Sequence, residues 1–347
     1  MPDHVTQKVL DTLIERWSID DDWLVRDDNG FSWWGCPLGQ RINVEGPHEI
    51  AGLPTYHLTF DVPIFDVADV EPSKLTSLLP LLNRAWNVGA FLVEDNVLKL
   101  CGRTYFMEPT APFRTDQMAT VAITAYEYAL ASMTELVKNS AELGIGAAKG
   151  ILDNDHPTQG PRRDMDEMLD VIDGAIRPSG ELAVPTQRQV DFEMAYQALL
   201  TKDRWMPEQI EGGVQGTHIG REGTIMETAV FRYQMIEHPL LGHGYLTTFT
   251  VQGETYEHED DALAASNRRC AAWNALEWQH TDDPPLIALG AWTNNIGGPD
   301  YNPLRADVTY ALFEPKIVGA AESAFIAVTG AFARVQLLDG PRQVMQA

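Results

Sequence analysis

Apolar residues in the first 140 positions recur with helical spacing in three segments. Residues 3–17 place apolar side chains three to four positions apart behind Asp3, so we expect an amphipathic helix with Asp3 as its N-cap. Residues 71–86 and 118–136 show the same spacing and predict a second helix, which Pro80 would kink, and a long third helix.

The segments between these helices are rich in β-branched and aromatic residues and predict strands. They cover residues 21–35, 40–44, 54–65 and 90–107. The dipeptide Asn29-Gly30 is typical of a two-residue hairpin turn because both residues tolerate positive φ, and residues 94–96 predict a second hairpin.

The second half of the chain repeats this order of elements. Thr186 and Gln189 form a capping-box pattern at the start of a helix, residues 258–279 predict a middle helix, and residues 317–335 predict a last one. Strand-like segments lie between them, at 217–236, 244–252, 286–296 and 304–313. The apolar stretches before the last helix of each half both end in Glu-Pro, at 108–109 and 314–315.

These patterns predict an α+β protein of two tandem α-β-β-β-α-β-β-α units. We expect a first unit at 1–140, a linker with one short helix at 141–186 and a second unit at 187–340, because residues 140–186 are rich in Gly, Pro and polar residues. Each unit would be an antiparallel sheet with helices packed on one face, and the two units would form an intrachain pseudo-dimer.

Residues 78–107 read LLPLLNRAWNVGAFLVEDNVLKLCGRTYFM, and residues 271–292 are a degenerate second copy. The segment resembles the YbjN-like pattern of the type III secretion chaperone-like fold, in which a helix with an Asn-containing end precedes a hairpin that turns on acidic residues and Asn. Members of that fold are usually short single chains that dimerise, whereas this chain carries two copies. Members of the family bind partially unfolded effector proteins or have no assigned activity, so the resemblance implies a chaperone-like, protein-binding module.

The chain has 347 residues, with 25 basic against 50 acidic side chains, which gives a net charge of −25. Such a charge is repelled by phosphate backbones and anionic lipids, so we expect neither nucleic acid nor membrane as a partner. The three cysteines have no metal-ligand spacing, and the first 17 residues are too charged for a signal peptide. These features favour a cytoplasmic protein, and no motif predicts a cofactor.

His238, His243 and His258, with the neighbouring Glu259, are the densest set of potential metal ligands. Histidines in turns beside Pro and Gly are more often ordinary solvent-facing residues, so a metal site is only the alternative interpretation. No G-x-S-x-G or other nucleophile motif is present, and no catalytic residue is predicted.

Phe31, Trp33 and Trp34 form an aromatic run in a predicted strand. Adjacent strand residues point to opposite faces of a sheet, so Trp33 and Trp34 cannot both enter a one-sided core. One of them needs a cover, which is either another part of this chain or a partner, and an intramolecular cover is favoured. The partner alternative makes these three residues candidate partner-binding residues.

The expected function is therefore non-enzymatic protein binding, through a sheet edge or an apolar groove. Two alternatives stay open at this point. One is an enzyme with a carboxylate and histidine site, with or without a metal, in a cleft between the halves. The other is a structural component of a larger assembly.

Overall fold

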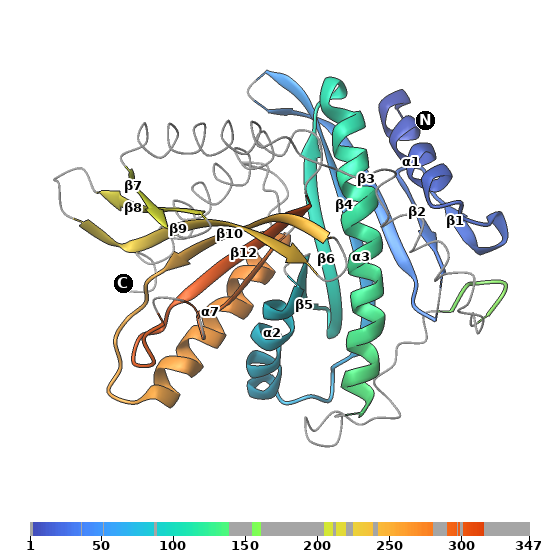
Figure 1. Cartoon of the computed structure of the whole chain (residues 1–347). Coiled ribbons are helices and arrows are strands. Elements are labelled where there is room, and N and C mark those ends of the chain that lie inside the picture. The colour runs from blue at the N-terminus through green and yellow to red at the C-terminus, as the bar shows by residue number, and fades with distance from the viewer. Residues whose placement is uncertain are drawn as a thin grey trace. The chain divides into compact units, whose positions relative to one another are not determined.

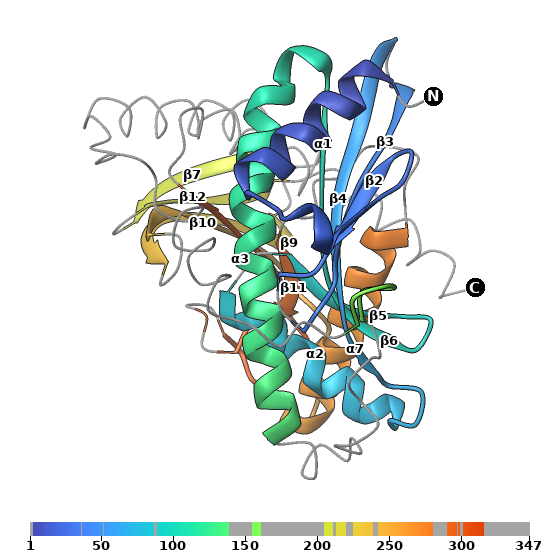
Figure 2. The ribbon, with the colours of Figure 1, turned by 90° about the vertical axis from the view of Figure 1, so that its right-hand side faces the viewer.

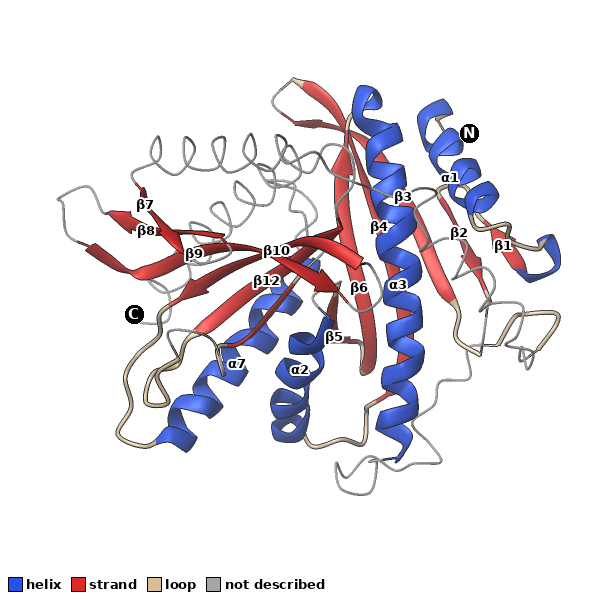
Figure 3. Ribbon diagram, viewed as in Figure 1, coloured by secondary structure: helices blue, strands red, loops and turns tan. Residues whose placement is uncertain are grey.

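The computed structural model divides into two compact units. Unit 1 comprises Met1–Ser179 and Asn274–Leu289, and unit 2 comprises Gly180–Trp273 and Gly290–Ala347. The structure describes residues 3–35, 37–50, 52–86, 89–138, 155–160, 205–210, 213–219, 225–238, 242–279, 290–296, 298 and 301–315. Its elements are labelled in Figure 1 and coloured by type in Figure 3.

Unit 1 contains a six-stranded antiparallel sheet of order β1-β2-β3-β4-β6-β5. The strands are β1 (Leu24–Arg26), β2 (Gly30–Trp33), β3 (Gln40–Ile50), β4 (Leu53–Asp66), β5 (Ala90–Glu94) and β6 (Val97–Phe106). The helices are α1 (His4–Arg16), α2 (Pro72–Trp86) and α3 (Ala111–Lys138), with short 3-10 turns η1 (Asp21–Trp23) and η2 (Glu108–Thr110).

Helices α1 and α3 lie side by side on one face of this sheet, as the two views together show (Figure 1 and Figure 2). Asp3 caps α1, as expected, by accepting a hydrogen bond from the Val5 amide at 3.0 Å. Trp17 joins the two helices, because its indole nitrogen donates to the Ala119 carbonyl at 3.0 Å. The core of unit 1 is therefore the layer between these helices and the sheet.

Both predicted hairpins are present, but the glycine of the first hairpin is needed for a reason other than its turn conformation. Asp95 and Asn96 have φ angles of 50° and 63° and make the turn between β5 and β6. Gly30, in contrast, is not a positive-φ residue. A Cβ atom there would lie 2.3 Å from the Ile42 carbonyl oxygen, so strand β3 leaves room only for glycine.

Unit 2 contains a second six-stranded antiparallel sheet, of order β11-β12-β10-β9-β8-β7. Its strands are β7 (Trp205–Ile210), β8 (Gly213–Ile219), β9 (Ile225–His238), β10 (Gly242–Val251), β11 (Ala291–Asn294) and β12 (Val308–Pro315). Helix α7 (Glu259–Gln279) begins in unit 2, and its residues from Asn274 on group with unit 1. Helix α7 lies against β12 and β11, and the Trp273 ring meets the buried Trp292 ring at 4.6 Å.

The two sheets have the same connectivity, since β7 to β12 follow each other in unit 2 as β1 to β6 do in unit 1. Antiparallel α+β architecture is thus as predicted. The strand count is corrected: four strands, not three, precede the middle helix of each unit. The predicted helices after Thr186 and at 317–335, and most of the linker, lie outside the described residues.

The boundaries expected at 140, 186 and 340 fall in segments outside the described residues. The units are also not contiguous in sequence, because residues 274–289 group with unit 1. Within unit 1, the buried Arg103 donates to the Trp278 carbonyl at 2.5 Å and lies over the Trp278 ring. No helix in the described part of the chain has an apolar stretch long enough to cross a bilayer.

Candidate functional site

Phe31, Trp33 and Trp34 are all buried, with at most 5 % of any of the three side chains exposed. Trp33 stacks on Trp17 with the ring centres 5.6 Å apart, and its indole nitrogen donates to Gln40 at 2.9 Å. Phe31 meets Trp17 edge to face at 6.1 Å. Phe31 and Trp33 are therefore core residues beneath α1 and α3.

Trp34 is covered by a turn of the predicted linker, residues 155–160. The His156 ring stands edge to face against Trp34 at 4.8 Å and against Trp23 at 5.7 Å. The same ring closes the turn, because its Nδ1 accepts the amides of Thr158 at 3.3 Å and Gln159 at 3.1 Å. Trp34 is thus covered by another part of the same chain, and none of these three residues has an exposed aromatic surface for a partner.

The outer edge of strand β5 is occupied by a side chain of helix α2. Asn83 is buried, its Oδ1 accepts from the Phe91 amide at 2.6 Å, and its Nδ2 donates to the Phe91 carbonyl at 3.0 Å. An added strand would need these same backbone groups of Phe91. The Asn-containing helix end that carried the family resemblance thus closes a sheet edge here.

The candidate metal ligands do not form a described site. The side chains of His238 and His243 lie outside the described residues, although the backbone pairs Gly242 with His238 and His243 with Glu237. His258 is exposed just before α7. Among the side chains that the structure does describe, no three of His, Cys, Asp or Glu gather as a metal site would require.

The thiols of Cys101 and Cys270 are buried and held in the neutral form. Burial raises the pKa of Cys101 well above its ordinary value, and it raises the pKa of Cys270 to about 12. A nucleophilic cysteine needs the thiolate, so these two residues are structural. Cys36 lies outside the described residues.

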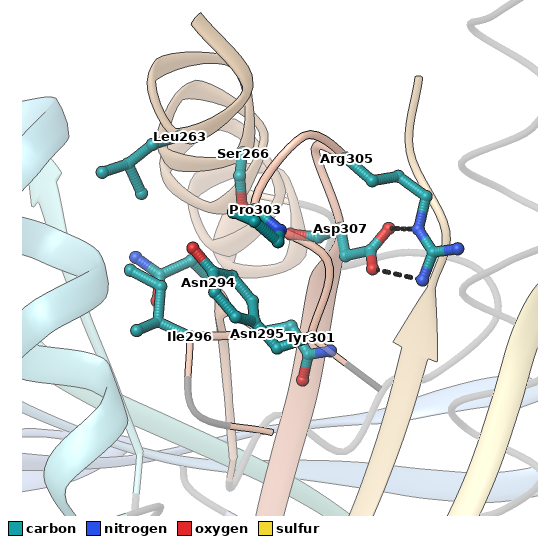
Figure 4. Close-up of a pocket in the computed structure, with 9 residues that line it drawn as sticks. All are labelled: Leu263, Ser266, Asn294, Asn295, Ile296, Tyr301, Pro303, Arg305 and Asp307. Atoms are coloured by element: carbon teal, nitrogen blue, oxygen red, sulfur yellow. Dashed lines mark hydrogen bonds and ion pairs between the residues drawn. The ribbon is translucent and has the colours of Figure 1, made fainter. Parts of the chain in front are cut away.

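Unit 2 contains a small pocket between α7, the end of β11 and the loop that leads into β12 (Figure 4). Its cavity volume of about 10 Å³ is enough for one water molecule or one group of similar size. The residues around it are Leu263, Ser266, Asn294, Asn295, Ile296, Tyr301, Pro303, Arg305 and Asp307.

The pocket has a polar interior with one unused hydrogen-bond acceptor. Asn294 is 4 % exposed, and its Nδ2 donates to Asn267 Oδ1 at 2.9 Å. Its Oδ1 is buried and has no hydrogen-bond partner among the described residues. Asn295 differs, since its Oδ1 accepts from the Thr309 hydroxyl at 3.1 Å. A buried acceptor without a donor is costly, and with less than 1 Å² of accessible surface this oxygen is closed to a ligand on the surface.

The charged groups of the pocket neutralise each other. Arg305 forms a two-bond ion pair with Asp307, at 2.7 Å from Nε and 2.8 Å from the terminal nitrogen (Figure 4). Asp307 is 2 % exposed and also accepts the Gly253 amide at 3.0 Å. The Ser266 hydroxyl donates to the Asp307 main-chain carbonyl at 2.5 Å. Among the described residues of the pocket, the Ser266 hydroxyl is therefore engaged by a main-chain carbonyl and not by a base that could activate it.

Two large exposed apolar side chains line the pocket, and a third belongs to its loop. Leu263 and Tyr301 line it, and Leu304 follows Pro303 in the same loop; they are 36 %, 42 % and 38 % exposed. The described part of the chain has six such residues, and the other three, Val25, Leu53 and Leu81, belong to unit 1. We call the surface formed by Leu263, Tyr301, Leu304 and the pocket the docking face.

Sequence reasoning did not find the docking face. The sequence predicts strands at 286–296 and 304–313, and none of the predicted binding residues lies in these segments. The available signal was the polar pair Asn294-Asn295 at the end of an otherwise apolar strand. Which of these amides keeps an unused acceptor depends on Asn267 and Thr309, which lie 27 and 14 residues away in sequence.

Comparisons of the chain with protein-family models, with curated proteins and with solved structures find no match. The docking face therefore has to be interpreted from its own chemistry.

Proposed function

We propose that the protein is a non-enzymatic binding module that holds a segment of another protein on the docking face of unit 2. The observation that carries this proposal is a set of three large exposed apolar side chains in and beside one small polar pocket. Apolar contact area provides affinity, and a few placed polar groups fix the register of the bound segment.

The proposed mode of binding uses the docking face and not the edge of strand β5. Asn83 already occupies the outward backbone groups of Phe91 on strand β5, so that edge position is closed to strand addition. On the docking face, in contrast, Leu263, Tyr301 and Leu304 each remain more than a third exposed.

The resemblance to the type III secretion chaperone-like and YbjN-like pattern supports the same proposal, because it implies a protein-binding module. The shared connectivity of the two sheets fits a duplicated unit of this kind. A pseudo-dimer of the two units and a cytoplasmic location are parts of the proposal. Fold-level likeness is a weak reason for a function, so the docking face carries the argument.

The test is an array of synthetic 15-residue peptides of varied composition, incubated with the full-length protein. The wild-type chain is expected to bind a subset of the peptides, and Leu263→Glu is expected to lose them, because a carboxylate would replace apolar contact at the centre of the face. Leu53→Glu is the matched control, since Leu53 is 51 % exposed and lies in unit 1.

Two results would contradict the proposal. One is an array on which the wild-type protein binds no peptide above the level of an unrelated acidic protein. The other is equal binding by the two glutamate variants, which would place the contact somewhere other than the docking face.

A further inference from the structure

The turn at residues 155–160 is closed around a single histidine ring. Nδ1 of His156 accepts the Thr158 amide at 3.3 Å and the Gln159 amide at 3.1 Å, and it lies 3.2 Å from the Thr158 hydroxyl. A backbone amide can only donate, so Nδ1 carries no proton and the neutral ring has its proton on Nε2. The closed turn therefore selects one protonation state and one tautomer of His156.

The rest of the His156 ring is enclosed by aromatic side chains. His156 is 6 % exposed, and its Nε2 is buried without a hydrogen-bond partner among the described residues. The rings of Trp34 and Trp23 stand edge to face against it, with ring centres 4.8 and 5.7 Å away. An imidazolium has two N–H donors. In this place Nδ1–H would point at two other donors and Nε2–H would have no acceptor, so the closed turn fits the neutral ring and disfavours the charged one.

The charged groups on the segments that contact this ring are carboxylates, and they do not offset the effect. Asp155 precedes the ring in the turn, and Asp20–Asp22 lead into Trp23, whereas strand β2 before Trp34 carries no charged side chain. All four carboxylates are exposed, and in the described part of the chain none of them bonds to either ring nitrogen. Water and salt screen their attraction for an imidazolium, so it is weaker than the loss of the bonds that close the turn.

We propose that the turn at residues 155–160 is a pH-sensitive latch, which opens when His156 takes up a second proton and thereby uncovers Trp34. Histidine that is free in water has a pKa of about 6.5. Because only the neutral ring fits the closed turn, the closed form has its full stability above that pH and loses stability as the pH falls below it. His156, Trp23 and Trp34 all belong to unit 1, so the latch is independent of the docking face.

Amide hydrogen exchange of the full-length protein measures the opening of this latch. The amides to follow are those of Thr158 and Gln159, which bond the ring, and that of Gly160, which donates to the His156 carbonyl at 3.0 Å. If the open ring titrates at about 6.5, the ratio of closed to open turn falls about tenfold between about pH 7.5 and about pH 5.5. After correction for the intrinsic effect of pH on exchange, the protection of these amides is expected to fall by the same factor.

His156→Asn is the variant that isolates the titrating ring. The asparagine amide offers an oxygen acceptor to the same backbone amides, and it does not titrate in this pH range. Its turn is expected to show equal protection at the two pH values. His258→Asn is the matched control, since His258 is exposed and lies in unit 2, and this variant should keep the tenfold change.

Fluorescence gives a second measurement, which does not require the His156→Asn variant to close its turn. Acrylamide is expected to quench the wild-type protein more strongly at the lower pH, because the open turn uncovers Trp34. In Trp34→Phe most of this increase should be missing, whereas protonation elsewhere in the chain affects both proteins alike.

Three results would overturn the latch. The first is wild-type protection that is the same at both pH values after the correction. The second is a tenfold change that persists in His156→Asn, which would assign the titration to another group such as Asp155. The third is a pH-dependent increase in quenching that is equally large in Trp34→Phe, which would mean that acid does not uncover Trp34.

Discussion

At the scale of single residues, buried amide side chains perform tasks that apolar residues cannot. Gln40 accepts from the Trp33 indole at 2.9 Å and donates to the Ala122 carbonyl at 2.8 Å, so it joins the sheet to helix α3 without exposing a polar atom. Asn83 does the same for an edge strand, by pairing with both backbone groups of Phe91. Each amide provides a donor and an acceptor in one planar group, which matches the pattern of a peptide.

Asn83→Ala is expected to destabilise the protein by about 2–4 kcal/mol. Two buried hydrogen bonds are worth about 1 kcal/mol each, and the loss of one side chain also leaves the Phe91 amide and carbonyl without partners. Urea unfolding of the full chain, followed by circular dichroism, measures the change.

Ser77→Ala on the same helix is the control, because Ser77 is exposed and its hydroxyl bonds only the Ser73 carbonyl one turn earlier. It should stay within about 0.5 kcal/mol of wild type. A loss of less than about 0.5 kcal/mol for Asn83→Ala as well would show that water replaces the amide and that the β5 edge is open.

The role of a single residue could be predicted from the sequence where it depends on neighbours along the chain. Asp3 as an N-cap and Asp95-Asn96 as a turn were predictable because both depend on backbone groups within a few positions. The requirement for glycine at position 30 was not predictable, since it comes from the Ile42 carbonyl oxygen of another strand. The unpaired Oδ1 of Asn294 was not predictable either, because its environment depends on residues that are distant in sequence.

At the scale of elements, the clearest contact is the one between the turn at 155–160 and the end of the first hairpin. The turn is closed by its own bonds, including that of the Gly160 amide to the His156 carbonyl at 3.0 Å. It meets Trp34 and Trp23 through the His156 ring. Period-two alternation predicted that one tryptophan of the pair needs a cover, although it did not identify which segment supplies it.

His156→Ala is expected to expose Trp34 and to increase the quenching of tryptophan fluorescence by acrylamide. The substitution removes the ring that closes the turn and the ring that covers Trp34, at a cost of about 1 kcal/mol in stability. Stern–Volmer constants for the variant and the wild type give the measurement, with the chain's nine tryptophans as the common background.

Two further variants show whether the signal comes from the predicted contact. Gln159→Ala removes only an exposed side chain and should leave quenching unchanged. In a Trp34→Phe background, His156→Ala should add much less quenching than it does in wild type. An equal increase in both backgrounds would mean that the turn does not cover Trp34 in solution.

Strand β7 illustrates why element counts from sequence fall short. The segment Trp205–Ile210 reads WMPEQI, and its proline and glutamate interrupt the alternation that marks a strand. It is the last strand in the order of its sheet, bonded only to β8, and an edge position tolerates proline. This segment therefore forms a strand, despite its weak sequence pattern, because it pairs with β8.

At the scale of the whole molecule, the repeat of elements was visible in sequence and the division into units was only partly so. Helix and strand spacings recur in both halves, and the sheets indeed share one connectivity. The assignment of residues 274–289 to unit 1 follows from contacts such as that of Arg103 with Trp278, which are separated by 175 positions. Local periodicity contains no information about contacts of that range.

The net charge of −25 predicts that screening stabilises the whole molecule. Repulsion among 50 acidic side chains against 25 basic ones acts over long distances, and raising NaCl from about 10 to about 100 mM shortens the Debye length from about 30 to about 10 Å. Salt also weakens the surface ion pairs Arg26–Asp11 and Arg41–Asp27, but exposed pairs of this kind contribute less than about 1 kcal/mol each.

Because the repulsion outweighs these few pairs, the melting temperature is expected to rise with salt, by about 2–4 °C for each 1 kcal/mol gained. Thermal scans by circular dichroism at the two concentrations provide the measurement. Sucrose at matched osmolality separates screening from exclusion effects, since it stabilises folded proteins without shielding charge. A melting temperature that falls as NaCl is added would show that attractive pairs dominate.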